Sequence, residues 1–175
     1  MKWSENTQHI CDKVNRKIYI LGKLKKFGLR TEELLTVWKT VLRPLTEYAT
    51  PLWHSGLTAV DSDMLESLQK RSLGIILGVT YVNNKRRYKF DGKTLSYEQT
   101  LEKTNLDLLK DRREFLTKKF ALQAVDDARH NEMFQPKIHN VNTRLKSKYQ
   151  EYFCETNRLK VSAVPYITRM LNNNT

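Results

Sequence analysis

Apolar residues recur at the helical spacing of three or four along most of the first 78 residues, and this periodicity constrains the fold more than any other feature. The first apolar stripe ends at Gly28 and the last ends at Gly78. The connections at residues 28–31 and 54–61 are short, so helices that follow one another should lie antiparallel. Each stripe needs partners that cover it. The pattern therefore predicts a three-helix bundle over residues 1–78.

Capping residues and prolines mark the predicted helix ends. The first helix should begin near Ser4–Thr7, and Thr31 is a suitable N-cap for the second because its hydroxyl can accept a backbone N–H. Pro44 and Pro51 should kink or divide that second helix, since proline lacks the N–H that an α-helix requires. The third helix should begin near Asp61, whose carboxylate suits the positive end of a helix.

The chain changes character after residue 78. Residues 79–95 are polar and basic, which predicts a loop or a small hairpin. Ser96 and the glutamine three residues later have the spacing of a capping box, so a short helix should follow. A longer helix is predicted from Asp107 to about Asp127. Residues 79–130 are thus expected to form a basic loop and a helical extension of the bundle.

The C-terminal part gives a weaker pattern. Pro136 interrupts the periodicity, residues 143–152 can form a further helix, and residues 162–166 and 172–174 have the composition of an extended tail. Residues 131–175 are therefore predicted to be irregular or weakly helical. The predicted fold class is all-α, with the bundle followed by the basic loop, the long helix and the irregular tail.

The charge of the chain points to a polyanionic partner. Its 31 Lys and Arg residues exceed its 19 Asp and Glu residues, which gives a formal net charge of +12. Such an excess favours binding to a nucleic acid. Two basic segments, residues 1–30 with 8 basic and 2 acidic groups and residues 81–120 with 11 and 6, flank a slightly acidic, apolar middle.

Two compact basic clusters are the candidate nucleic-acid-binding sites, because clustered cations neutralise phosphates and release counterions. The first cluster lies in the first predicted helix and the second in the basic loop. Their members are Lys13, Arg16, Lys23, Lys25 and Lys26, and Lys85, Arg86, Arg87 and Lys89. Tyr88 and Phe90 interleave the second cluster and can stack on unpaired bases. The alternative is a solvated basic face, with both aromatic side chains packed on the bundle.

Several other classes of protein are poorly supported. The two cysteines, Cys11 and Cys154, form no C-x-x-C pair, so neither a disulfide framework nor a zinc finger is predicted, and a reducing compartment fits best. The longest apolar runs are far shorter than the ~18 residues of a membrane span, and the N-terminus has no hydrophobic signal region. We expect an intracellular protein without a membrane partner. The sequence does not decide between nucleus and cytoplasm.

Two segments carry a resemblance to a known family. The run from Leu42 to Trp53, LRPLTEYATPLW, is followed by LESLQKRSLGIILG from Leu65 to Gly78. Together they resemble the segment downstream of the polymerase palm in non-LTR (LINE-type, jockey-like) retrotransposon reverse transcriptases. Flanking residues have a similar order and spacing, namely Trp3, Ser4, His9, Ile10, Lys13, Leu24 and Gly28 before the segments, and Tyr97, Leu106, Leu109, Arg112, Arg113, Leu116, Lys119, Phe120 and Ala121 after them.

This resemblance implies the thumb and C-terminal region of such a polymerase. A thumb lies across the template-primer duplex and contacts its phosphates without reading bases, so the expected partner is an RNA/DNA hybrid or a structured RNA, together with an upstream palm domain. The resemblance also implies that Met1 opens in the middle of a family segment, as in a truncated element copy. Two alternatives stand beside it, an independent basic helical module that binds RNA or DNA, and a relic or protein-interaction domain.

The sequence supplies no catalytic motif for polymerisation. Reverse transcriptases need an aromatic-x-Asp-Asp turn whose carboxylates hold divalent ions. The pair Asp126 and Asp127 lacks the aromatic and continues a helical pattern, so we interpret it as a solvated helix end. Residues 92–94, Gly-Lys-Thr, lack the earlier glycine of a P-loop, and the four histidines are scattered. We expect no enzymatic activity and no cofactor, since the parent polymerase would hold its metal ions in a palm that is absent here.

The sequence leaves the roles of four polar residues undecided. Arg112 and Arg113 flank the stripe of the long predicted helix, where an ion pair or a carbonyl contact is favoured over nucleic acid by about two to one. Gln69 and Arg71 match polar positions of the family motif. The sequence does not show whether they bind nucleic acid or fix the packing.

Overall fold

In the computed structural model, which describes residues 3–130, 132–137 and 147–173, the chain forms two units. The first unit contains the described residues up to Tyr48 together with Thr58–Arg112, and the second contains Ala49–Leu57 and the described residues from Arg113 onward. The expected division after residues 78 and 130 differs from this one. The strands that follow residue 78 pack on the helix before them, and the segment Ala49–Leu57 packs on the C-terminal helix.

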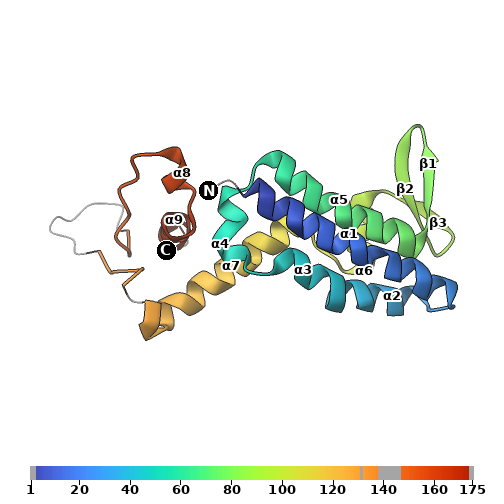
Figure 1. Cartoon of the computed structure of the whole chain (residues 1–175), viewed down its shortest axis with the longest axis horizontal. Coiled ribbons are helices and arrows are strands. Elements are labelled where there is room, and N and C mark those ends of the chain that lie inside the picture. The colour runs from blue at the N-terminus through green and yellow to red at the C-terminus, as the bar shows by residue number, and fades with distance from the viewer. Residues whose placement is uncertain (1–2, 131, 138–146, 174–175) are drawn as a thin grey trace. The chain divides into compact units, whose positions relative to one another are not determined.

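The predicted bundle forms the body of the first unit (Figure 1). Helix α1 (Ser4–Lys26) and helix α5 (Ala59–Leu77) pack along each other, and α2 (Thr31–Val37) and α3 (Arg43–Glu47) cover them. Helices α1 and α5 run in the same direction, since Ser4 bonds Asp61 near their starts and Lys25 bonds Ile75 near their ends. Most residues of the predicted stripes are buried, whereas Val41, predicted for the buried face of the second helix, is 48% exposed, and Leu73 is buried without having been predicted. The buried apolar side chains include Ile10, Val14, Ile18, Leu21, Leu34, Trp38, Leu42, Leu65, Leu68, Leu73 and Ile76.

The second helix of the bundle is divided at both prolines, as predicted. Before Pro44 it widens into a π-helical turn (Trp38–Leu42), in which the N–H of Arg43 donates to the carbonyl of Trp38, five residues back. Pro44 has no N–H to give to the preceding turn. Before Pro51 the chain breaks at Ala49, whose φ of +52° lies in the left-handed region, and α4 (Thr50–Trp53) begins.

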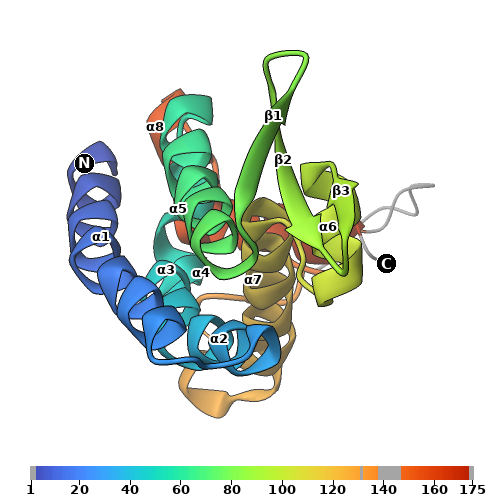
Figure 2. The same cartoon turned by 90° about the vertical axis from the view of Figure 1, so that its right-hand side faces the viewer.

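A three-stranded antiparallel sheet follows α5 and corrects the all-α prediction to a mainly helical fold (Figure 2). Strands β1 (Val79–Val82), β2 (Lys85–Phe90) and β3 (Lys93–Leu95) pair in chain order. The two-residue turns have positive φ throughout, 49° and 59° at Asn83–Asn84 and 47° and 73° at Asp91–Gly92, as type I′ hairpin turns require. Of the two predictions for this segment, the hairpin is correct, and a third strand extends it.

The capping box at Ser96 is confirmed. Ser96 accepts the N–H of Gln99, Gln99 accepts the N–H of Ser96, and helix α6 (Tyr97–Thr104) begins there. The long predicted helix is α7 (Leu109–Asp126), and its first residues belong to the first unit.

The second unit has a small core of its own. Ala121 and Ala124 of α7 pack with Phe134, Tyr149 and Ile167. The side-chain amide of Asn172 pairs with the backbone of Tyr149 in both directions, at 2.9 and 3.1 Å.

The predicted extended tail is wrong, because Ala163–Asn173 forms helix α9 after the short α8 (Asn157–Lys160). Pro165 lies in the first turn of α9, where its missing N–H costs nothing. Of the helix predicted over residues 143–152, residues 143–146 lie outside the described residues. Residues 147–152 are not helical, and Tyr149 forms a bridge with Pro136.

The end of α5 depends on glycine at position 78. Gly78 has φ +93° and ψ 152°, a backbone conformation that only glycine adopts without strain. We expect Gly78→Ala to lower the free energy of unfolding by about 1–3 kcal/mol in urea titrations followed by circular dichroism.

Gly22→Ala is the matched control, because Gly22 lies inside α1 and a Cβ there would meet its nearest atom, Ile75 Cγ2, at an ordinary 3.9 Å. The free energy of unfolding of this variant should rise by about 0.5–1 kcal/mol, because alanine has a higher helix propensity than glycine. Equal stability of both variants would contradict the conformation at Gly78.

Candidate nucleic-acid interface

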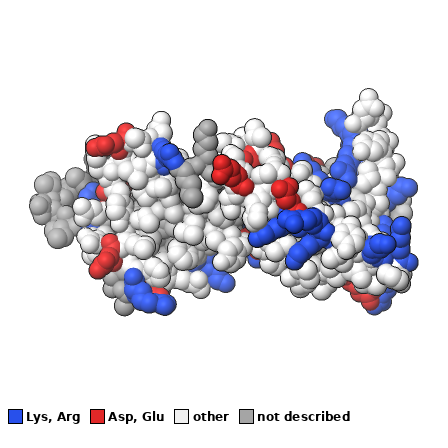
Figure 3. Space-filling view, viewed as in Figure 1, with Lys and Arg blue, Asp and Glu red and all other residues white. Residues whose placement is uncertain are grey.

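The first basic cluster lies on the outer side of α1, opposite the buried stripe. All five of its members are exposed, and four of them, Lys13, Arg16, Lys23 and Lys26, follow one face of the helix at spacings of three and seven. Figure 3 shows Lys and Arg side chains gathered over α1. The Lys25 ammonium instead turns to α5 and donates to the carbonyl of Ile75 at 2.9 Å. Lys25 therefore caps the end of α5, which leaves four outward cations.

A groove between α1 and α5 adds a further cation to this row. It encloses about 330 Å³ and is lined by Tyr19, Lys23, Lys26 and Arg71, among others. Arg71 Nη1 donates to Asn15 Oδ1 at 3.1 Å, so its guanidinium crosses from α5 to α1 while remaining exposed. The sequence did not decide the role of Arg71. The packing of α5 on α1 brings it beside the lysines.

The pleat of β2 divides the second cluster. Alternation along the strand places Lys85, Arg87 and Lys89 on one face and Arg86 and Tyr88 on the other. The Arg86 guanidinium lies 5.6 Å from the centre of the Tyr88 ring and also lies against the backbone of Gly74, where a Cβ would collide with it. Arg86 therefore packs the sheet against the end of α5.

Base stacking by Tyr88 is excluded by its burial. Only 1% of this residue is exposed, its hydroxyl donates to the carbonyl of Lys70 at 3.3 Å, and desolvation raises its pKa. The alternative prediction, packing on the bundle, is correct for Tyr88, and Phe90 is half-buried. The exposed aromatic residue of the sheet is Tyr81, at 70%, which the sequence analysis did not select.

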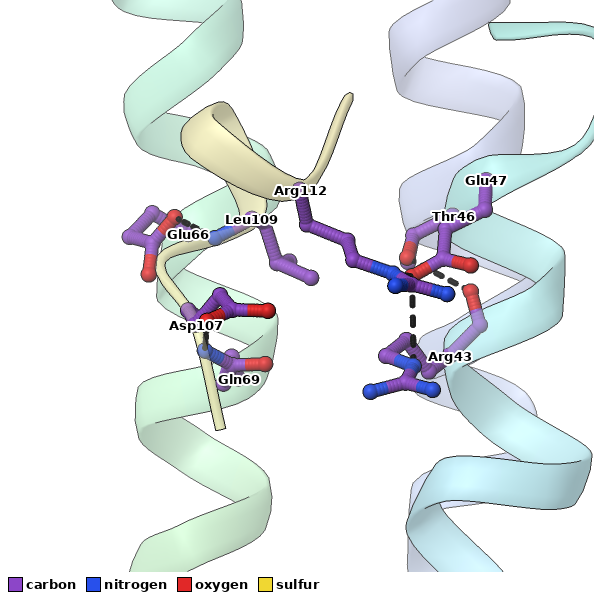
Figure 4. A network of polar contacts seen from close by, with 8 residues as sticks. All are labelled: Arg43, Thr46, Glu47, Glu66, Gln69, Asp107, Leu109 and Arg112. Carbon is purple, nitrogen blue, oxygen red and sulfur yellow. Dashed lines mark hydrogen bonds and ion pairs between the residues drawn. The ribbon is translucent and has the colours of Figure 1, made fainter. Parts of the chain in front are cut away.

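Gln69 fixes the packing of the first unit (Figure 4). It is fully buried, and its amide donates to the Tyr97 hydroxyl at 3.1 Å and to the carbonyl of Asp107 at 2.9 Å. One turn earlier on α5, Glu66 accepts the Tyr97 hydroxyl and the N–H of Leu109. Burial, and then the Glu66 carboxylate, raise the pKa of Tyr97. These bonds hold the start of α7 on α5.

Arg112 forms the structural ion pair that the sequence favours. Its Nε lies 3.1 Å from Glu47 Oε1, and Arg43 Nε approaches the same oxygen at 3.1 Å. Figure 4 shows the two guanidinium groups facing this one carboxylate. The three side chains are only 13–26% exposed, so the pairs are partly shielded from water. Arg113 is buried, at 1% exposure, and offers no surface to a nucleic acid.

The acidic pair lies at the end of a helix, as interpreted from the sequence, and the Gly-Lys-Thr segment lies at a turn of the sheet. Helix α7 ends at Asp126, and the hydrogen bonds of Arg129 hold the pKa of the Asp127 carboxyl well below its usual range. Gly92 lies in the β2–β3 turn, and Lys93 begins a strand, whereas a P-loop leads into a helix. Among the described residues, no three His, Cys, Asp or Glu side chains gather closely enough to hold a metal ion.

Comparisons with known proteins do not assign the chain to a family. No protein-family model, curated protein or solved structure matches it significantly. In the part of the chain that the structure describes, no helix combines the length and the apolarity needed to cross a membrane. The functional argument therefore rests on the geometry and charge of the basic faces.

The Glu47 ion pairs give a test of the structural role of Arg112. We expect Glu47→Gln to lower the free energy of unfolding by about 1–3 kcal/mol, because two partly buried guanidinium groups then lose their shared charge partner. Urea titration measures the change. Glu33→Gln is the control, because the ion pair between Glu33 and Arg30 is exposed, at 45% and 79% of the two side chains. This pair should contribute less than about 1 kcal/mol to the free energy of unfolding. An equal effect of both variants would contradict the shielded network.

Proposed function

We propose that the chain is a nucleic-acid-binding fragment related to the thumb and C-terminal region of a LINE-type reverse transcriptase. In this proposal it holds the template-primer duplex through phosphates, without reading bases and without catalytic activity of its own. The observation that carries the proposal is the row of outward cations on α1, continued by Arg71 across the groove to α5.

The length of the row suits a nucleic-acid strand. Lys13 and Lys26 are 13 residues apart in one helix, which at about 1.5 Å per residue is about 20 Å. A strand of a duplex rises about 3.4 Å per nucleotide, so the row spans about six nucleotides. The rigid helix holds the charges in order before binding, which lowers the entropy cost of association.

The residue types support contact with phosphates over reading of bases. Lysine is a compact charge on a flexible stem and binds phosphate without the fixed bidentate geometry that arginine offers to guanine. Three of the four outward cations of the first cluster are lysines. An A-form or hybrid duplex is bound mainly through its shape and its sugar-phosphate backbone. Such contacts favour placement and retention of a duplex of any sequence.

Exposed apolar side chains support a second candidate function, a protein-interaction domain. In the first unit, Phe27 is 81% exposed and Val41 is 48% exposed. Large exposed apolar groups of this kind often mark surfaces that a protein partner covers. The upstream palm domain of the parent polymerase would be such a partner, and a relic without that partner would expose the same surface.

Fluorescence-anisotropy titration of an RNA/DNA hybrid across a salt series tests the proposal. With four or five phosphate contacts, log K should fall with log salt at a slope of about −3 to −5. Lys13→Ala, Arg16→Ala and Lys23→Ala should each weaken binding to every sequence alike and reduce the slope by about one.

Lys110→Ala is the control for this titration, because Lys110 is an exposed lysine on α7, outside both clusters. It should leave both the affinity and the slope nearly unchanged. A folded sample that binds no hybrid at low salt would overturn the nucleic-acid proposal and leave the protein-interaction domain. Equal losses for Lys110 and the α1 cations would contradict the location of the interface.

A further inference from the structure

We propose that Tyr81 stacks on an unpaired base, so that the β1–β2 ribbon binds a single-stranded segment of the nucleic acid that α1 holds as a duplex. This inference rests on the proposed function and narrows its substrate class to a duplex with a single-stranded extension.

The ribbon projects from the first unit and has a defined tip. Figures 1 and 2 both show the β1–β2 turn rising clear of the helices of this unit. The turn contains only Asn83 and Asn84, both in the left-handed region, which suits the twist of the paired strands. A two-residue turn has little conformational freedom, so the side chains next to it are held in a fixed register.

Tyr81 is an aromatic side chain that the fold does not use for packing. It lies on the same face of the sheet as Tyr88, because Tyr81 pairs with Arg86 and Val79 pairs with Tyr88. Near the base of the ribbon this face is buried at Tyr88, at 1% exposure, whereas near the tip it is open at Tyr81, at 70%. An open aromatic ring offers a flat surface on which any base can stack.

The charge of the sheet indicates the chemistry of the ligand. Residues 79–95 contain five cations, Lys85, Arg86, Arg87, Lys89 and Lys93, and a single carboxylate, Asp91. Lys85, Arg87 and Lys89 lie on the face of the sheet opposite Tyr81, so the positive charge covers both faces of the ribbon. Cations that follow a backbone, combined with an aromatic ring that receives bases, are the two parts of a single-strand binding site. A duplex keeps its bases stacked inside, so the ring selects an unpaired base.

Arg86 lies across the ribbon from Tyr81, and its guanidinium is held by the fold. As the cross-strand partner of Tyr81, it has its Cβ about 4.5–5.5 Å from that of the tyrosine. Its guanidinium is already held by the Tyr88 ring and by the close approach to Gly74. Arg86 therefore adds positive charge to this face of the ribbon, while its guanidinium stays beside Tyr88, against the end of α5.

Two probes and the full chain test this inference. One probe is a blunt RNA/DNA hybrid, and the other is the same hybrid with a single-stranded extension that contains 2-aminopurine. The wild-type chain should bind the extended probe more tightly and quench its fluorescence by stacking. Tyr81→Ala should weaken binding to the extended probe about 5-fold or more, abolish the quenching and leave the blunt probe within about 2-fold. Tyr81→Phe should behave as wild type, because it keeps the ring.

Val82→Ala is the matched control, since Val82 is the next residue of the strand, is 45% exposed and points to the opposite face. It should bind both probes as wild type does. Unchanged binding and quenching in Tyr81→Ala, with the blunt probe still bound, would overturn this inference and leave the proposed function intact. If the wild-type chain binds neither probe at low salt, both this inference and the proposed function fail. Circular dichroism shows whether each variant keeps the fold.

Discussion

The parallel packing of α1 on α5 sets the position of nearly everything else in the first unit. It buries the apolar stripes of both helices, and it therefore also decides which side chains are left outside. Bonds near both ends, from Ser4 to Asp61 and from Lys25 to Ile75, hold the register of the pair. Because that register is held, Arg71 comes to lie beside Lys23 and Lys26, although the sequence separates them by more than forty residues. The basic face is thus a product of the hydrophobic core beneath it.

Features that depend on neighbouring residues could be predicted from the sequence. Gly28, Gly78 and Ser96 mark helix ends through their own backbone preferences or hydroxyl groups, and the structure places helix ends at all three. Features that depend on residues distant in the sequence could not be predicted in this way. The strand Lys85–Phe90 is rich in charge and lacks a β-forming composition, and only its turns and its packing on α5 make it a strand. The C-terminal helix was missed because residues 162–166 and 172–174 have the composition of an extended tail, although Pro165 falls in the first turn of a helix, where proline is tolerated.

The same limit applies to the candidate site. Counting charges found the outward cations of α1, yet it could not separate them from Lys25 and Arg86, which face other parts of the fold. It also favoured Tyr88 over Tyr81, because Tyr88 lies between Arg87 and Lys89 in the sequence, whereas the packing of the sheet buries Tyr88 and leaves Tyr81 exposed. Gln69 and Arg112 look alike in sequence as polar residues of a basic chain. The structure gives both of them internal partners.

The two tight turns of the sheet restrict how its length can vary. Each turn has two residues, so the strands on either side are in register from the first pair onward. Inserting or deleting one residue within β2 would move every following side chain to the other face, and Lys89 or Arg87 would then occupy the buried place of Tyr88. Changes of two residues keep the faces and only lengthen or shorten the ribbon. Viable variants of this chain should therefore differ in ribbon length by even numbers, with the turn sequences kept.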